Sequence, residues 1–188
     1  MNVLILRKET DLLTEVGRRI VGATVLGVTY RQTERGGLNV PPVGVAHEVD
    51  LEVVLRLSTG VISVTWERDD LVEGLALGWE DAADPEGVAA VPADNSESWR
   101  GLVGHAITNV YASWQVSEVN CPESMWSIRF SFGPRLHVVI ALGELDVSGW
   151  PMYHPDSLLL LFDENMARSY RPSGAIGSAW GEQSLLVR

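Results

Sequence analysis

A stretch of thirteen residues near the start of the chain recurs 82 positions later. Residues 18–30 read RRIVGATVLGVTY, and residues 100–112 read RGLVGHAITNVYA. The pairs that match in character are Ile20 with Leu102, Val21 with Val103, Gly22 with Gly104, Val25 with Ile107 and Val28 with Val110. Self-similarity at a fixed offset is the sequence signature of a unit that is folded more than once. The chain is therefore predicted to contain two copies of one unit.

A second similarity follows each of these stretches. Residues 51–57 and residues 126–132 both carry apolar side chains at every second position. This period of two is typical of a strand with one face on a core. A short turn comes next, at residues 58–60 and 133–135, and an apolar run then returns as the expected hairpin partner. The offset is now 75, because the intervening loop is shorter in the second half, a change that loops tolerate.

The other expected elements are short. Thr10 is expected to cap a helix of a few turns in which Leu13, Val16 and Ile20 share one face. Further strands, rich in apolar and β-branched side chains, are expected at residues 24–31, 75–77, 106–116 and 158–162. The order of elements is then the same in the two halves.

These patterns predict an α+β fold that is predominantly antiparallel β. We expect two tandem pseudo-symmetric β-rich repeats with short helices, packed as a sandwich or as abutting half-barrels so that each covers the apolar face of the other. The expected boundaries are residues 1–80 for the first repeat, 81–98 for an acidic linker and 99–188 for the second repeat. Two repeats that form one composite domain, and a chance likeness between two β-rich segments, remain alternatives.

Charge is distributed unevenly along the chain. The net charge is −11, from 25 acidic and 14 basic residues, and no Lys or Arg stands between Arg68 and Arg100. The acidic residues in that interval are Asp69, Asp70, Glu73, Glu80, Asp81, Asp84, Glu86, Asp94 and Glu97. Such a field repels phosphate backbones and attracts a basic protein, so direct nucleic-acid binding is not expected. The alternative interpretation is a solvated, solubilising linker.

Composition also bears on the compartment. No apolar run approaches the ~20 residues that span a bilayer, so no membrane association is expected. Residues 1–7 lack the basic start and the cleavage site of a signal peptide. The single cysteine, Cys121, excludes an internal disulfide and fits a reducing environment. A cytoplasmic location is the resulting expectation.

Sequence motifs for catalysis are missing. The chain has no G-x-S-x-G elbow, no phosphate-binding loop, no H-E-x-x-H and no cysteine pairs at zinc spacing. The spacing of the four histidines predicts no shared site, so neither a metal nor a cofactor is expected. The densest polar group is Tyr153-His154-Pro155-Asp156, in an expected loop. His154 and Asp156 suit a general acid–base pair, although a structural turn at Pro155 explains the same residues.

The seven tryptophans are many for 188 residues. Most are expected in the core, because aromatic side chains bury large areas. Trp79, Trp150 and Trp180 stand close to expected strand ends or loops, and tryptophan is enriched at binding hot spots. These three are therefore candidate anchors for a partner.

The first functional hypothesis is a non-enzymatic binding protein that engages a basic protein partner. In size, acidity and lack of motifs the chain resembles the immunity proteins that neutralise bacterial toxins, a resemblance of type that no residue motif carries. Electrostatic steering would speed association and aromatic anchors would slow dissociation. The residues expected to contact the partner are Asp69, Asp70, Glu73, Trp79, Glu80, Asp81, Asp84, Trp150, Tyr153, His154 and Asp156.

Two other hypotheses stay open. A small-molecule binder or hydrolase would place a pocket between the two repeats and use His154, Asp156 and nearby aromatic side chains. A structural module would pair exposed strand edges between copies of the chain. The sequence does not predict the oligomeric state.

Overall fold

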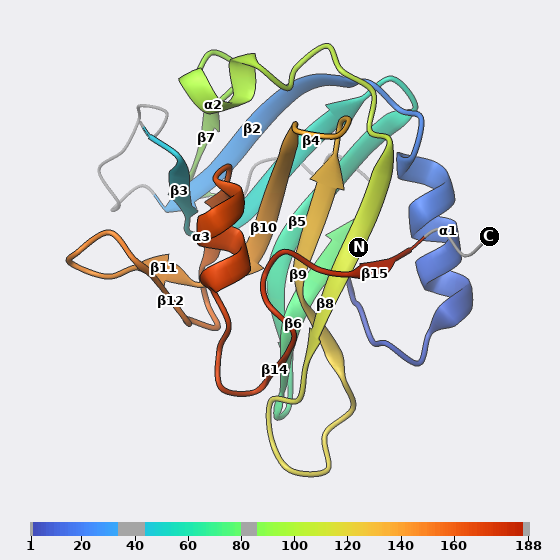
Figure 1. Cartoon of the computed structure of the whole chain (residues 1–188), viewed down its shortest axis with the longest axis vertical. Helices are drawn as coiled ribbons and strands as arrows, with labels where there is room; N and C mark the ends of the chain where they lie inside the picture. Colours follow the sequence, from blue (N-terminus) through green and yellow to red (C-terminus); the bar gives the residue numbers. More distant parts are fainter. Residues whose placement is uncertain (1, 34–43, 80–85, 186–188) are drawn as a thin grey trace.

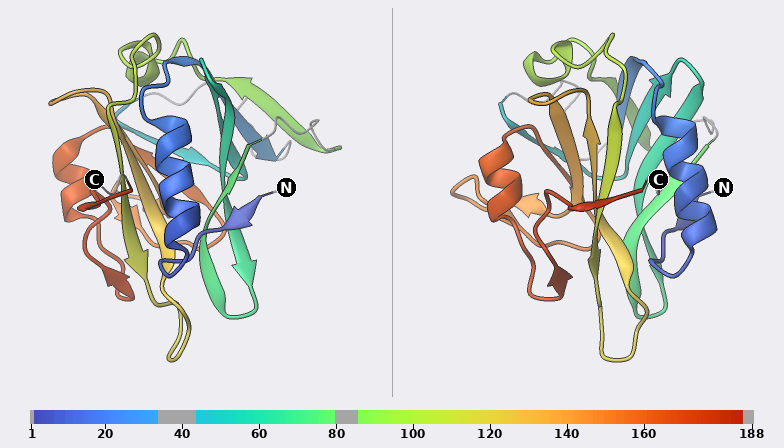
Figure 2. Two further views of the ribbon diagram at one scale, coloured as in Figure 1. Left: turned by 90° about the vertical axis from the view of Figure 1, so that its right-hand side faces the viewer. Right: turned by 45° about the vertical axis from the view of Figure 1, so that its right-hand side comes forward.

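Two antiparallel sheets face one another and enclose the core (Figures 1 and 2). The computed structural model describes residues 2–33, 44–79 and 86–185. All strand pairings in these ranges are antiparallel. The prediction of an α+β fold that is mainly antiparallel β is confirmed.

The first sheet, called sheet A, is built from the N-terminal half of the chain. Its strands, in spatial order, are β1 (Val3–Leu4), β6 (Val72–Gly78), β5 (Gly60–Asp69), β4 (Glu52–Leu57), β2 (Val25–Thr33) and β7 (Val88–Pro92). The expected strand over residues 51–57 is β4, and Val53, Leu55 and Leu57 point into the core as the alternation predicts.

The second sheet, sheet B, is built mainly from the C-terminal half. Two short strands, β14 (Ala175–Ile176) and β15 (Gln183–Ser184), pair with β8 (Asn109–Gln115). The order continues with β9 (Ser124–Ser131), β10 (His137–Leu142), β13 (Leu158–Leu161) and β3 (Ala46–Val49). The strand β3 therefore crosses from the first half of the chain to the edge of sheet B. The remaining strands, β11 (Glu144–Leu145) and β12 (Pro151–Met152), form a separate hairpin.

Glycine closes the two long hairpins in the same way. Gly60, the first residue of β5, has φ +141°, and Gly133, in the turn between β9 and β10, has φ +142°. A residue with a side chain is strained in this backbone conformation, whereas glycine adopts it freely. Each turn then brings apolar partners together across the hairpin, Leu55 opposite Ile62 and Phe130 opposite Val138.

Helix α1 (Thr10–Ile20) covers the open side between the two sheets (Figure 2). Its buried face contains Leu13, Val16 and Ile20, the spacing that the sequence predicts. The prediction that Thr10 caps this helix is wrong: Thr10 is the first helical residue, and the preceding Glu9 occupies the cap position without a side-chain hydrogen bond.

Two shorter helices have side-chain caps. Ser96 accepts a hydrogen bond from the Trp99 N–H and caps α2 (Glu97–Arg100). Asp163 caps α3 (Glu164–Ser169), which lies on the outer face of sheet B in Figure 2. Helix α3 was not expected, because six residues are too few to give a clear periodic pattern.

The two stretches that share a sequence pattern lie against one another. Thr24 and Ala106 form an isolated antiparallel bridge. Around it, the Gly22 N–H donates to the Ile107 carbonyl over 2.8 Å, and the Gly104 N–H donates to the Val25 carbonyl over 2.8 Å. The flanking bonds run from the Val25 N–H to the His105 carbonyl (3.1 Å) and from the Ile107 N–H to the Ala23 carbonyl (2.8 Å). Backbone pairing thus joins the starts of the two halves.

The expected linker contains regular structure. Residues 81–85 lie outside the described part, but β7 pairs with β2 along the edge of sheet A, and α2 begins within the same segment. One hydrophobic cluster also spans both sheets, with Leu55 and Val64 from sheet A and Ile128 and Phe130 from sheet B.

Candidate functional site

A short hairpin projects from the body of the protein at the left of Figure 1. It runs through residues 144–152, and Leu145 pairs with Pro151 across it. Asp146 braces the turn, because its Oδ1 accepts hydrogen bonds from the backbone N–H groups of Ser148 (2.7 Å) and Trp150 (2.9 Å). Its own N–H donates to the Trp150 carbonyl over 2.8 Å. The tip of this projecting hairpin is therefore held in one conformation by its own hydrogen bonds.

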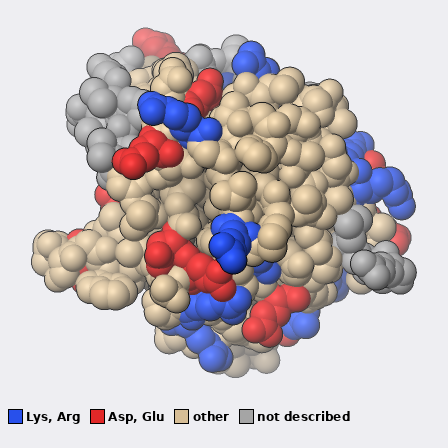
Figure 3. Space-filling view, turned by 45° about the horizontal axis from the view of Figure 1, so that its top comes forward, with Lys and Arg blue, Asp and Glu red and all other residues tan. Residues whose placement is uncertain are grey.

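The projecting hairpin exposes large apolar side chains. Val147 is fully exposed, Trp150 is 59% exposed and Met152 is 43% exposed. Single exposed apolar residues are common on protein surfaces, but three within six positions on one projection form a patch, and such patches mark interaction sites. Figure 3 shows this projection at the left, with mostly uncharged atoms. Tryptophan is also the residue most enriched at binding hot spots.

Carboxylates lie around the base of the hairpin. Glu48, on β3, accepts a hydrogen bond from the Leu145 N–H at its Oε1 over 2.6 Å. Glu144 and Asp146 belong to the hairpin itself, and Asp156 is exposed four residues beyond its end. An apolar tip with an acidic base suits a partner whose surface is apolar at the centre and basic around it.

A cavity of about 430 Å³, the hairpin pocket, lies behind the projection. It is lined by Trp150, Pro151, Met152, Tyr153, Ser169, Tyr170, Arg171 and Pro172. The Arg171 guanidinium in its wall donates from Nε (3.4 Å) and Nη2 (3.3 Å) to the Ala175 carbonyl. All of these residues belong to the second half of the chain, so the hairpin pocket does not lie between the two halves.

Two predicted site residues from distant positions meet in a hydrogen-bond network. The Tyr153 hydroxyl donates to Oε2 of Glu73 over 2.9 Å, and Gln115 Nε2 donates to the same hydroxyl over 3.1 Å. Burial raises the pKa of Tyr153, so the phenol stays protonated and remains a donor. The Glu73 carbonyl accepts from Gln115 Nε2 (3.0 Å), Ser117 Oγ (3.2 Å) and Ser124 Oγ (2.6 Å). Glu73 therefore ties β6 to sheet B and to the segment after the hairpin.

The turn between β5 and β6 adds a second acidic group to this side. Asp69 and Asp70 are exposed there, and Asp70 has a left-handed backbone with φ +55°. Arg68 donates from Nε to the Asp70 carbonyl over 3.1 Å, and its Nη2 lies 3.7 Å from Oε1 of Glu73. Arg68 thus links Asp70 to Glu73, and Glu73 in turn contacts Tyr153.

His154 and Asp156, which suit a general acid–base pair by residue type, are not hydrogen-bonded to each other in the described part of the chain. His154 is half-buried, and its Nδ1 is buried without a hydrogen-bond partner in the described part of the chain. Asp156 is exposed, and the described contacts include no hydrogen bond between the two. A general base needs an orienting partner within about 3 Å, which this arrangement does not supply.

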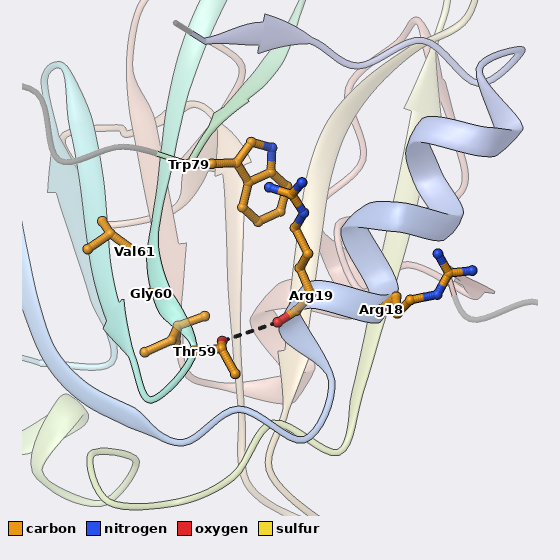
Figure 4. Close-up of a pocket in the computed structure, with 7 residues that line it drawn as sticks. Arg18, Arg19, Thr59, Gly60, Val61 and Trp79 are labelled. Carbon is orange, nitrogen blue, oxygen red and sulfur yellow. Dashed lines mark hydrogen bonds between the residues drawn. The ribbon is translucent and has the colours of Figure 1, made fainter.

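Two of the three candidate tryptophan anchors lie elsewhere. Trp79 is half-buried in a different cavity beside α1, shown in Figure 4. The interpretation of Trp180 as an exposed anchor is wrong, because this side chain is only 8% exposed. The ring is covered by the guanidinium groups of Arg129 and Arg168, 3.9 and 4.5 Å from its centroid. Glu80, Asp81 and Asp84, also predicted to bind the partner, lie outside the described residues.

Sequence reasoning missed most of the projecting hairpin. The site residues that were not expected are Glu48, Glu144, Asp146 and Val147, because two-residue strands leave no periodic pattern. One signal was available: Asp146-Val147-Ser148-Gly149 has turn composition between the apolar residues Leu145 and Trp150.

Within residues 2–33, 44–79 and 86–185, no group of three or more His, Cys, Asp or Glu side chains is arranged to hold a metal ion. No helix in the same ranges is long and apolar enough to cross a membrane. Comparisons with protein-family models, curated proteins and solved structures find no match to this chain.

Proposed function

We propose that this protein is a non-enzymatic binding protein that engages a basic protein partner, in the manner of an immunity protein that neutralises a toxin. The observation that carries the proposal is Trp150, 59% exposed on a hairpin whose turn is braced by Asp146. The projecting hairpin is the proposed contact surface. The carboxylates at its base, Glu48, Glu144 and Asp156, form the proposed acidic rim.

Pre-organisation favours this surface as a binding element. A loop that must be ordered on association loses conformational entropy, whereas a turn already held by Asp146 loses little. Truncation of a tryptophan at an interface hot spot costs about 2 kcal/mol or more, which corresponds to roughly 30-fold in affinity. Trp150 has the exposure and the fixed backbone that such an anchor needs.

Charge favours a basic partner. The chain carries a net charge of −11, and the acidic rim stands beside the apolar tip. Complementary charge raises the association rate and makes it depend on ionic strength, while buried apolar anchors lower the dissociation rate. We propose that this interaction takes place in the cytoplasm, because a chain whose only cysteine is Cys121 fits a reducing environment.

The test is affinity capture followed by kinetics. The wild-type protein, W150A and V119S are immobilised and exposed to an extract of the native host. Val119 is the matched control, because it is an apolar residue that is 85% exposed in the loop between β8 and β9, away from the hairpin. We expect wild type and V119S to retain the same basic protein and W150A to lose most of it.

Kinetics with the purified partner separate the two components of the proposal. We expect W150A to raise the dissociation rate at least 10-fold, and the double variant E144Q/D156N to lower the association rate and its salt dependence. Retention of a partner that is acidic, or equal affinities for wild type and W150A, would contradict the proposal.

The alternative of a hydrolase or small-molecule binder between the two halves has less support. His154 and Asp156 share no hydrogen bond among the described contacts, and the hairpin pocket beside them is lined by the second half alone. We therefore favour the protein-binding function.

We further propose that the two halves are pseudo-symmetric copies of one unit. The order β2–β4–β5–β6 in sheet A parallels the order β8–β9–β10–β13 in sheet B. A shift of 82 residues turns the bond from Gly22 to Ile107 into the bond from Gly104 to Val25, and both measure 2.8 Å. It also carries Thr24 onto Ala106, its partner in the bridge, which is what a local two-fold axis through this bridge requires.

A further inference from the structure

A second cavity, the α1 pocket, lies at the C-terminal end of α1 and has a volume of about 310 Å³ (Figure 4). Its walls come from three places: the last turn of α1, the turn between β4 and β5, and the residue after β6. The lining residues are Arg18, Arg19, Leu57, Thr59, Gly60, Val61 and Trp79. Only Trp79 among them was predicted from the sequence as a site residue.

We infer that the α1 pocket binds a small planar organic anion, namely a single aromatic ring that carries a carboxylate. The α1 pocket shares no lining residue with the hairpin pocket, and binding there does not require the proposed protein partner.

Charge at the α1 pocket favours an anionic ligand. Among the residues that the structure describes, two arginines and no carboxylate line the α1 pocket. Glu15 lies one turn back on α1, where its Oε2 accepts from Nη1 of Arg18 (2.9 Å) and its Oε1 accepts from Nε of Arg19 (2.8 Å). The hydrogen bond from Arg19 lowers the pKa of Glu15, which keeps this carboxylate ionised. Among the described side chains, two cations (Arg18 and Arg19) and one anion (Glu15) leave one positive charge here, in a chain whose net charge is −11.

Arg19 has hydrogen-bonding capacity that its contact with Glu15 does not use. A guanidinium has five N–H donors in a planar fork that suits a carboxylate. Arg19 uses its Nε for Glu15, so both terminal nitrogens remain outside that bond. In Figure 4 the Arg19 side chain extends toward Trp79, whereas the Arg18 guanidinium points away from it. Arg19 is therefore the residue that would hold the anionic group.

The α1 pocket has a flat apolar wall, formed by the Trp79 ring. The Arg19 Cζ lies 5.0 Å from the centroid of the Trp79 ring, a cation–π distance that fixes the ring beside the charge. Leu57 and Val61 supply aliphatic surface, and Thr59 Oγ1 donates to the Arg19 carbonyl over 3.3 Å, which ties the turn to the helix end. About 310 Å³ is at the lower end of the range for small-molecule sites, which favours one ring over a larger ligand.

The chain offers an internal control for this arrangement. Arg168, on α3, donates from Nε to Oε1 of Glu164 over 2.7 Å and stacks 4.5 Å from the centroid of Trp180. Arg168 thus has the same spacing to a glutamate on its own helix, and the same kind of cation–π contact with a tryptophan, as Arg19. Neither Arg168 nor Trp180 lines the α1 pocket or the hairpin pocket.

The test is a titration of the ¹⁵N-labelled full chain, followed through the indole N–H resonance of Trp79, which W79F assigns. The probes are benzoate, benzamidine as the cation of matched shape, and sulfate as an anion without a ring. We expect a saturable shift with benzoate, with a Kd on the order of 1 mM or tighter, and no saturation with the other two. The variant R19Q should weaken benzoate at least fivefold, R19K should restore part of the affinity, and R168Q should leave it unchanged.

Four outcomes overturn the inference. They are the lack of saturation with benzoate up to about 20 mM, equal binding of benzamidine, saturation by sulfate at the same site, and an R19Q affinity equal to wild type. Thermal unfolding of each variant checks that the fold is retained. The Arg18 guanidinium points away from Trp79, so R18Q provides a second charge variant that keeps the contact between Arg19 and Trp79.

Discussion

The hydroxyl of Tyr30 lies 2.8 Å from Nδ1 of His47 in the buried core. The same hydroxyl accepts a hydrogen bond from the indole N–H of Trp99, so its proton is directed to His47. His47 is 1% exposed, and burial lowers its pKa to about 4 from the ordinary value of 6.5. This relay keeps a neutral histidine between the sheets and ties β3, at the edge of sheet B, to β2 of sheet A.

Acid is therefore expected to destabilise the fold through His47. His47 takes up a proton near pH 6.5 in the unfolded chain, but only near pH 4 in the folded one. The contribution of neutral His47 to the free energy of unfolding is therefore complete above pH 6.5 and disappears as the pH falls to 4. The difference of 2.5 pKa units corresponds to about 3 kcal/mol. Urea unfolding between pH 7 and pH 4.5 measures this loss, and H47Q should flatten the dependence.

His137 is the matched control for that experiment. Burial also lowers its pKa, and its ring packs against Trp180 with the centroids 4.5 Å apart. H137Q should retain the steep pH dependence of the free energy of unfolding that comes from His47. A pH dependence of unfolding that is identical in wild type and H47Q would contradict the assignment.

Arg129 is expected to be the anchor that holds the C-terminal segment on sheet B. Its Cζ lies 3.9 Å from the ring centroids of both Tyr111 and Trp180. Its Nε donates to the Trp180 carbonyl over 2.7 Å and its Nη2 donates to the Gly181 carbonyl over 3.2 Å. Lysine keeps the charge but cannot form this planar fork, so R129K should lower the free energy of unfolding by about 2–3 kcal/mol.

Limited proteolysis checks where that loss occurs. R129K should expose the chain after β14 to cleavage well before the rest of the domain unfolds. Arg168 stacks on the same Trp180 ring from an exposed position, so R168K should change stability by less than about 0.5 kcal/mol. Uniform cleavage throughout R129K would exclude a local anchor.

Gly22 and Gly104 are expected to respond equally to substitution. Both have φ +90°, and an added Cβ would meet no atom within 4 Å at either position. Alanine is therefore penalised by backbone conformation alone, by about 1–2 kcal/mol at each site. Gly101, at φ −79° with equally open space, is the matched control, and G101A should not be destabilised. Thermal unfolding of the three variants checks this, and unequal losses for G22A and G104A would argue against pseudo-symmetry.

The fold was predictable where local pattern and burial agree. Apolar residues at every second position predicted β4 and β9, because one face of each strand lies on the core. Strands such as β3 and β7 were missed because their pairing depends on distant partners, β13 for the first and β2 for the second. No local pattern encodes these contacts.

The candidate site was predictable only in part, for the same physical reason. Trp150 and Tyr153 were identified by residue type and by their place in a loop. The meeting of Glu73 with Tyr153, 80 positions apart, depends on how β6 packs against sheet B. Trp180 was misjudged because its cover comes from Arg129 on a strand far away in sequence.

The contact between Tyr153 and Glu73 is expected to stabilise the junction of the two sheets below the projecting hairpin. Y153F removes the donor to a half-buried carboxylate, so it should lower the free energy of unfolding by about 1.5–3 kcal/mol, the range for a hydrogen bond to a charged group. E73Q keeps an acceptor oxygen but loses the charge, so it should lower the free energy of unfolding by less than Y153F does. Because each change disrupts the same bond, the double variant should lose less than the sum of the single ones.

Urea unfolding of the four proteins in this cycle gives the coupling energy, which we expect to be about 1 kcal/mol. Glu67 is the control carboxylate, since it is exposed on β5, and E67Q should change stability by less than about 0.5 kcal/mol. Strict additivity of Y153F and E73Q would mean that the hydrogen bond contributes nothing to stability. The projecting hairpin would then be held by the Asp146 turn and the Glu48 contact alone.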